Sequence, residues 1–136
     1  MCARILIIED NPANLGLMDY LLKYYGHEVL AALDGEAGLE LARGGFPEII
    51  ICDIQMPKLD GFGVARALKA DERLRHIPLV AITALAMVGD RERVLAGGFH
   101  GYISKPIEPQ AFVAQVEAFL PAGTSSASEA TARGGR

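Results

Sequence analysis

The chain has 136 residues, which is long enough for one domain with its own hydrophobic core. Its 51% hydrophobic and 22% charged residues are ordinary for a soluble protein, and no apolar run is long enough to span a bilayer. The formal net charge of −4 argues against direct binding to nucleic acid, which needs a basic face. Without a cleavable signal segment before the first strand-like run, we expect a cytoplasmic protein with no membrane contact.

Strand-like and helix-like segments alternate five times along the chain. The first strand, Arg4 to Ile8, is followed by Asn11-Pro12, which opens a helix that Gly26 is placed to end. Spacing of three and four residues predicts one apolar face for this helix, made of Leu15, Met18, Leu21, Leu22 and Tyr25. The other predicted strands are 27–31, 49–53, 79–82 and 101–104. A second helix follows the turn Asp34-Gly35, is indicated by Ala37, Leu39, Leu41 and Ala42, and is closed by Gly44-Gly45. The remaining predicted helices are 62–70, 90–96, capped by Asp90, and 109–120.

This alternation predicts an α/β fold with a parallel sheet covered by helices on both faces. The best fit is a doubly wound, flavodoxin-like sheet of five strands in the order 2-1-3-4-5, in which ligands bind beyond the carboxyl ends of the strands. We expect residues 1–121 to form this domain. Residues 122–136 are small and polar without apolar periodicity, so we expect a disordered tail or the start of a linker.

The third predicted strand, Ile49-Ile50-Ile51-Cys52-Asp53, is apolar throughout and ends on a carboxylate. Pro57 and Asp60-Gly61 prevent the strand from continuing, so Asp53 is expected where a buried sheet meets a loop. Cys2 and Cys52 lack the spacing of a metal or redox site, and Cys52 is expected to be a small core residue.

In the predicted topology, the ends of four neighbouring strands bring together Glu9, Asp10, Asp53, Thr83 and Lys105. Taken singly, each could be a cap, a turn residue or a surface residue, but their joint placement favours a site. Three carboxylates in one crevice need a nearby cation, or one of their pKa values must rise. Mg²⁺ suits carboxylate ligands, and Lys105 and Thr83 around Asp53 would form a clamp for phosphoryl transfer to that carboxylate.

Four stretches of the chain resemble the receiver domain of response regulators: Ile-Ile-Glu9-Asp10-Asn, Ile-Cys-Asp53-Ile-Gln-Met-Pro-Lys-Leu-Asp60-Gly61, Ala-Ile-Thr83-Ala and Gly-Tyr102-Ile-Ser-Lys105-Pro106. The resemblance covers about residues 4–120. It implies that Asp53 accepts a phosphoryl group from the phosphohistidine of a histidine kinase or phosphotransfer protein, and that the chain is a phosphoacceptor domain rather than an enzyme.

The resemblance also implies roles for the neighbouring residues. Asp10, Asp53 and the backbone carbonyl of Gln55 would be direct Mg²⁺ ligands, with Glu9 acting largely through water. Thr83 and Lys105 would contact the phosphoryl oxygens, and the bond between Lys105 and Pro106 would be cis.

Tyr102 has two interpretations, a half-buried aromatic residue on the last strand or the switch aromatic of the family. In the second, Thr83 moves toward the phosphoryl group and Tyr102 turns into the vacated space. The fourth helix, fifth strand and fifth helix would then shift together and contact a downstream protein. A homodimer that forms on phosphorylation is a further possible outcome. The apolar stretch from Ala84 to Val88 adjoins this face and is either core or part of a partner-binding surface.

Leu85 and Gln55 stand where the family tunes the water that attacks the phosphoryl group. Because an apolar Leu85 cannot orient that water by hydrogen bonding, we predict a long-lived phosphoaspartate. The three histidines, His27, His76 and His100, share no spacing and are interpreted as structural or surface residues. The phosphoryl donor must therefore belong to another protein or domain.

Two other functions share parts of this pattern. A flavodoxin-like redox module has the same sheet order, but Glu9-Asp10 would repel the phosphate of a flavin. An aspartate-nucleophile phosphatase would need a substrate pocket and a general acid, and neither is evident. Within the receiver interpretation, the chain is either a single-domain regulator or a segment of a larger regulator or hybrid kinase.

Overall fold

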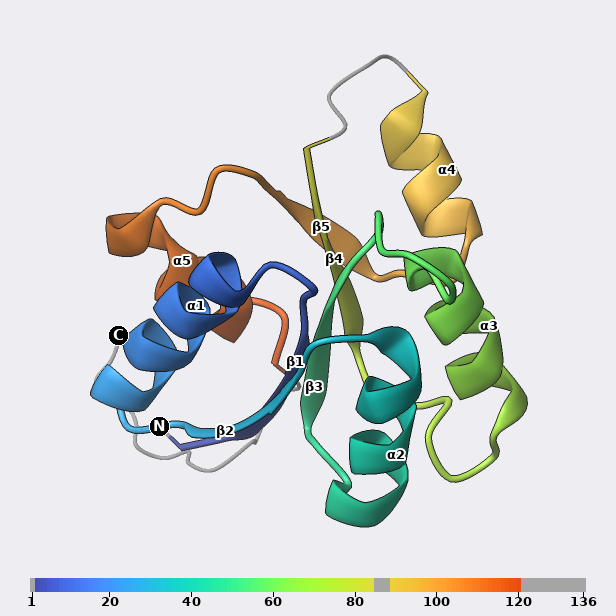
Figure 1. Cartoon of the computed structure of the whole chain (residues 1–136), viewed down its shortest axis with the longest axis horizontal. Coiled ribbons are helices and arrows are strands. Elements are labelled where there is room, and N and C mark those ends of the chain that lie inside the picture. The colour runs from blue at the N-terminus through green and yellow to red at the C-terminus, as the bar shows by residue number, and fades with distance from the viewer. Residues whose placement is uncertain (1, 85–88, 121–136) are drawn as a thin grey trace.

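The computed structural model describes residues 2–84 and 89–120 (Figure 1). Five strands alternate with five helices, as the sequence predicts. The strands are β1 (Arg4–Ile8), β2 (Glu28–Ala32), β3 (Ile49–Asp53), β4 (Leu79–Thr83) and β5 (Gly101–Ser104). The helices are α1 (Pro12–Tyr24), α2 (Gly35–Gly45), α3 (Gly61–Ala70), α4 (Asp90–Ala96) and α5 (Pro109–Glu117).

The strands form one parallel sheet in the order β2-β1-β3-β4-β5, which confirms the predicted doubly wound topology. The register brings the carboxyl ends of neighbouring strands to one level. Ile8 pairs with Cys52, Asp53 pairs with Ile82, and Thr83 pairs with Ser104. The side chains that follow or end these strands therefore meet at a single edge of the sheet.

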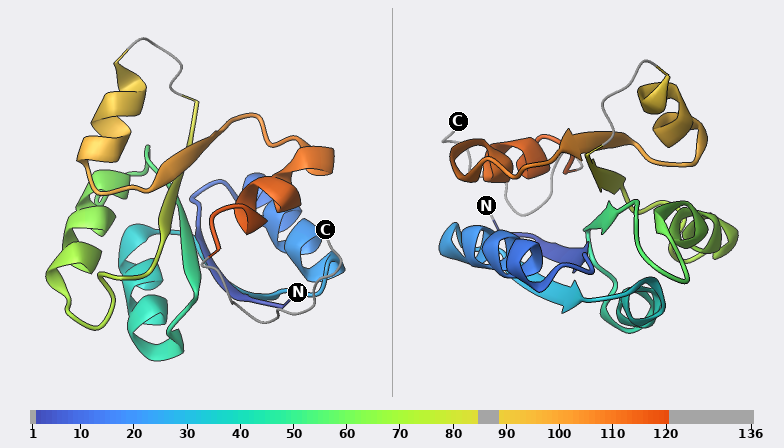
Figure 2. Two further views of the ribbon diagram at one scale, coloured as in Figure 1. Left: turned by 180° about the vertical axis from the view of Figure 1, so that it is seen from behind. Right: turned by 45° about the horizontal axis from the view of Figure 1, so that its top comes forward.

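Alternate residues of each buried strand face opposite sides of the sheet, so the molecule has two hydrophobic cores. Ile49 and Ile51 face α1 and α5, whereas Ile50 and Cys52 face α2, α3 and α4. Figures 1 and 2 show these two groups of helices on opposite faces of the sheet. All five residues of β3 are buried, which confirms the interpretation of its apolar sequence as a central strand.

Several predicted element ends differ from the structure. The helix α1 stops at Tyr24, so Tyr25 leaves the helical path and is 57% exposed instead of joining the apolar face. Gly26 has φ 92°, which confirms the left-handed residue expected there. At the end of α2 the left-handed residue is Phe46, with φ 46°, rather than a glycine, and at the start of α4 Gly89 instead of Asp90 is the N-cap residue.

The shorter final helix also corrects the prediction, because α5 ends at Glu117 rather than at residue 120. The predicted tail and most of the apolar stretch from Ala84 to Val88 lie outside the described residues. Across the described ranges, no helix is both long and apolar enough to cross a membrane.

Candidate functional site

Asp53 is the last residue of β3, and its side chain is almost completely buried. Two hydrogen bonds fix the chain immediately after it. The backbone N–H of Ile54 donates to the carbonyl of Ile82 at 3.2 Å, and the N–H of Gln55 donates to Asp53 Oδ1 at 3.3 Å. The carboxylate is therefore held by the sheet on one side and by its own loop on the other.

The loop after Asp53 folds back tightly at Gly61. The Gly61 N–H donates to the carbonyl of Ile54 at 2.9 Å, and a Cβ atom on Gly61 would lie 2.6 Å from the carbonyl oxygen of Asp53. Only glycine allows this approach. Asp60, just before it, is the N-cap of α3, and its Oδ1 accepts from the Gly63 N–H at 2.9 Å. Asp60-Gly61 thus sets the path of the loop below the site, whereas the sequence predicts only that the pair ends the strand.

Lys105 lies between two of the predicted acidic residues. Its Nζ is 3.3 Å from Asp53 Oδ2 and 3.4 Å from Glu9 Oε1. The backbone N–H of Lys105 donates to the carbonyl of Thr83 at 2.9 Å, which holds the lysine at the end of β5 beside the end of β4. The bond between Lys105 and Pro106 is cis, as expected from the resemblance.

The three carboxylates come together as the sequence predicts. Ligand oxygens of Glu9, Asp10 and Asp53 lie within 4.8 Å of one another. Burial, with repulsion from Asp53, raises the pKa of Glu9 from 4.5 to about 7, although a hydrogen bond from the Asn11 N–H and the charge of Lys105 oppose the shift. One carboxyl group of the cluster is therefore held partly protonated near neutral pH.

Glu9 Oε1 is buried and accepts no hydrogen bond from any described residue, although Lys105 Nζ lies at ion-pair distance. The other oxygen, Oε2, accepts from the Asn11 N–H at 3.1 Å. A buried carboxylate oxygen without a hydrogen bond is costly in a folded protein. A divalent cation among the three carboxylates would remove that cost and their mutual repulsion, so these residues fit a hard metal ion.

Other predicted site residues are placed as follows. Thr83 ends β4 and is buried, and Gln55 lies in the loop after β3 with an exposed side chain. Tyr102 lies on the edge strand β5, opposite Ala81, and is 36% exposed. Leu85 lies outside the described residues.

Cys52 is a core residue, as predicted. Its side chain is fully buried, and its Sγ donates to the carbonyl of Asp53 at 3.2 Å. Burial, followed by the charges of nearby carboxylates, raises the pKa of the Cys52 thiol far above its ordinary value, so it remains unreactive.

The histidines have structural or surface positions. His27 is buried; its Nδ1 accepts from the Ala3 N–H at 3.0 Å, and its Nε2 lies 2.7 Å from Glu117 Oε2. His100 Nδ1 accepts from the Leu79 N–H at 3.0 Å, and burial lowers its pKa. His76 is exposed. Among the described residues, the acidic cluster is the one group suited to a metal, and it contains no histidine.

Comparisons with known proteins agree on one family. The model of the response regulator receiver domain matches residues 5–117. The polar-differentiation response regulator DivK of Brucella ovis is 42% identical over 120 residues, covering 88% of this chain and 98% of DivK.

Two solved structures are also similar to this chain, each over 98% of its own length. The receiver domain of a sensor histidine kinase from Pseudomonas aeruginosa, with a magnesium ion in its active site cleft, is 31% identical over 88% of this chain with a TM-score of 0.78. The receiver domain of a histidine kinase from Syntrophus aciditrophicus is 28% identical over 96% of this chain with a TM-score of 0.80.

Proposed function

Because the chain belongs to the response regulator receiver family, whose members are signalling domains rather than enzymes, we propose that Asp53 accepts a phosphoryl group from a histidine kinase or phosphotransfer protein. The observation that supports this most directly is the position of Lys105 Nζ, 3.3 Å from a buried aspartate that sits in a cluster of three carboxylates. Residues 1–121 would form the receiver, and residues 122–136 a tail or linker.

In the proposed reaction, a carboxylate oxygen of Asp53 attacks the phosphorus of a partner's phosphohistidine. The new O–P bond forms as the P–N bond breaks, and the imidazole nitrogen leaves with the bonding electron pair and takes up a proton. The product is an aspartyl phosphate. Lys105 remains beside the acceptor and stabilises the charge that develops on the phosphoryl oxygens, and the Thr83 hydroxyl donates to one of them.

Mg²⁺ is the cofactor that the acidic cluster fits best, and a structural relative carries magnesium in its active site cleft. Asp10, Asp53 and the backbone carbonyl of Gln55 would hold it directly, with Glu9 acting largely through water. When bound, the metal would offset negative charge on the carboxylates and on the incoming phosphate. Glu9 must lose its proton to contribute its full charge.

The output would be a change in protein contacts made by α4, β5 and α5. Phosphorylation would draw Thr83 toward the phosphoryl group and let Tyr102 turn inward, which would change the surface offered to a downstream protein or to a second phosphorylated copy. Beryllofluoride, which mimics the phosphoryl group, should change the rotamer populations of Tyr102 in NMR spectra. Unchanged populations in a saturated complex would contradict this part of the proposal.

The experiment that tests the acceptor is phosphotransfer profiling against histidine kinases, combined with intact mass spectrometry after treatment with acetyl phosphate and Mg²⁺. The wild type should gain one phosphoryl group, and Asp53→Asn should gain none. The control is Asp60→Asn, which changes a nearby carboxylate but keeps an oxygen to cap α3. Labelling that persists in Asp53→Asn would remove Asp53 as the acceptor.

A further inference from the structure

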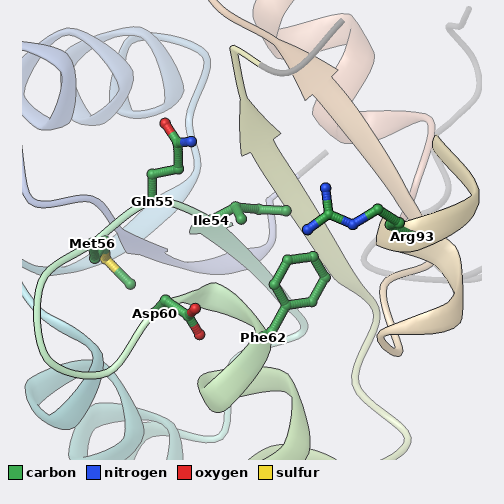
Figure 3. A pocket seen from close by; sticks show the side chains of 6 residues that line it. All are labelled: Ile54, Gln55, Met56, Asp60, Phe62 and Arg93. Carbon is green, nitrogen blue, oxygen red and sulfur yellow. The ribbon is translucent and has the colours of Figure 1, made fainter. Parts of the chain in front are cut away.

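A cleft of about 500 Å³ lies beside the loop that follows Asp53 (Figure 3). It is bounded by this loop, the start of α3 and the side of α4. Its lining residues are Ile54, Gln55, Met56, Asp60, Phe62 and Arg93. Glu9, Asp10, Asp53, Lys105 and Tyr102 are not among its lining residues, whereas Gln55 belongs both to the cleft and to the proposed magnesium site. The cleft therefore adjoins the proposed phosphoryl site and shares one loop residue with it.

The cleft has an apolar and well-supported floor. Ile54 and Met56 are buried parts of the core on the α3 side of the sheet. The ring of Phe62 packs edge-on against Phe99, with centroids 5.9 Å apart, and a Cβ atom on Gly97 would lie 2.6 Å from the Phe62 ring. Because these contacts fix Phe62 from behind, the floor is preformed and offers its apolar surface to an incoming side chain.

Arg93 supplies a positive charge at the rim. Its guanidinium carbon is 5.9 Å from the centre of the Phe62 ring, and Nη1 is 3.4 Å from Asp90 Oδ1. Figure 3 shows the guanidinium reaching from α4 across the cleft, above Phe62 and toward Ile54. A guanidinium has five N–H donors in a planar fork. Among the described residues Arg93 has one ion pair, with Asp90, which leaves donors for a second carboxylate.

The opposite wall carries a negative charge, which the start of α3 offsets in part. Asp60 caps α3, with its Oδ1 accepting from the Gly63 N–H at 2.9 Å next to the positive end of the helix dipole. The cleft therefore combines an apolar floor, a cation with spare donors and, on the opposite wall, an exposed carboxylate whose Oδ1 caps α3. Charge complementarity favours an occupant that brings an apolar group together with an acid.

We propose that this cleft is a docking site for a segment of a partner protein in which an aromatic or aliphatic side chain stands next to a carboxylate. The apolar side chain would contact Ile54, Met56 and Phe62, and the carboxylate would pair with Arg93. The site lies between α3 and α4, away from the α5 and β5 part of the proposed output surface. Its occupancy does not require phosphorylation, so the partner can be bound before Asp53 reacts.

The test uses NMR titration of the uniformly ¹⁵N-labelled full chain with two matched peptides, N-acetylated and C-amidated. One has the sequence Asp-Phe-Leu-Asp and the other Lys-Phe-Leu-Lys. The acidic peptide should shift the amide signals of Ile54, Phe62 and Arg93, and Arg93→Gln should weaken its binding roughly tenfold because a charge-assisted pair is lost. Arg91→Gln removes a neighbouring exposed charge on α4 that does not line the cleft, and should bind as the wild type does.

Several results would overturn the proposal. They are equal shifts with the acidic and basic peptides, shifts that lie outside the cleft, unchanged affinity in Arg93→Gln, or no saturable binding at all. Shifts of the same signals with protein concentration, before any peptide is added, would assign the cleft to a second copy of the chain and not to a partner. Because the titration needs no phosphoryl donor, it stands or falls independently of the phosphotransfer experiment.

Discussion

Replacing Glu9 with Gln should stabilise the metal-free protein at neutral and alkaline pH. Glu9 is fully buried, and burial with repulsion from Asp53 raises its pKa from 4.5 to about 7. A carboxyl group with a raised pKa favours the folded state below its unfolded pKa, and that contribution is lost as the pH rises through the folded pKa. Glu9 therefore lowers stability progressively between about pH 4.5 and pH 7, and Gln at this position has no charge to bury.

The difference between the two pKa values of Glu9 corresponds to a destabilisation of the folded state of at most about 3 kcal/mol. Water reaches the half-buried Asp10 next to it, and Lys105 loses one carboxylate partner in the variant, so we expect a gain of about 1–3 kcal/mol. The gain is measured by urea unfolding in EDTA, at about pH 5 and about pH 8, as the difference in the free energy of unfolding between Glu9→Gln and the wild type. Comparison at each pH cancels the titration of all other groups.

The difference between Glu9→Gln and wild type should be small at the lower pH and should grow to its full value at the higher pH. Two parallel stability profiles would refute the reasoning, because Glu9 would then titrate alike in the folded and unfolded chains. Adding Mg²⁺ at the higher pH should reduce the difference, since a cation beside the carboxylates offsets the charge that Gln removes. A control titration with KCl at matched ionic strength separates this effect from screening.

Three further predictions concern the loop, the far end of the sheet and the lifetime of the product. Gly61→Ala should cost about 2 kcal/mol or more in urea unfolding and slow phosphorylation, because the new Cβ meets the backbone of Asp53 and Ile54, which cannot move aside. His27→Ala should cost about 2 kcal/mol at neutral pH without changing phosphorylation, because it leaves the buried Ala3 N–H without its acceptor. The phosphorylated chain should lose its phosphoryl group slowly with Mg²⁺ and without a phosphatase; a half-life of only seconds would contradict the interpretation of the apolar Leu85.

Much of the fold could be predicted because its signals are local. An unbroken apolar run such as Ile49-Ile50-Ile51 is long enough for one buried strand, and the alternation with helices leaves few topologies. The exact ends of the helices were harder to predict, because they depend on small differences in backbone free energy. Phe46 takes a left-handed conformation that glycine would adopt more easily, and an apolar Tyr25 is left outside the helix. Neither position has a sequence pattern that distinguishes it.

The composition of the acidic site could be predicted, but its internal electrostatics could not. The sequence indicated that three carboxylates at one edge need a cation or a raised pKa, without indicating which group would change. In the structure the pKa of Glu9 is raised, because Glu9 is fully buried and is repelled by the nearby Asp53. The cleft below Arg93 could not be predicted either, because Phe62 belongs to α3 whereas Arg93 and Gly97 belong to α4 and its C-cap, and their contacts depend on how the two helices pack.

The cost of Glu9 to the metal-free fold is also an argument about its role. A residue selected only for stability at this position would be apolar, since it lies fully buried beside a buried aspartate. Lys105 cannot fully compensate, because it is shared between Glu9 and Asp53 at nearly equal distances. The cluster therefore lacks positive charge, and the lack is greatest when all three acids are ionised. A divalent cation would supply that charge. Its binding at this site would then be coupled to the release of a proton from Glu9.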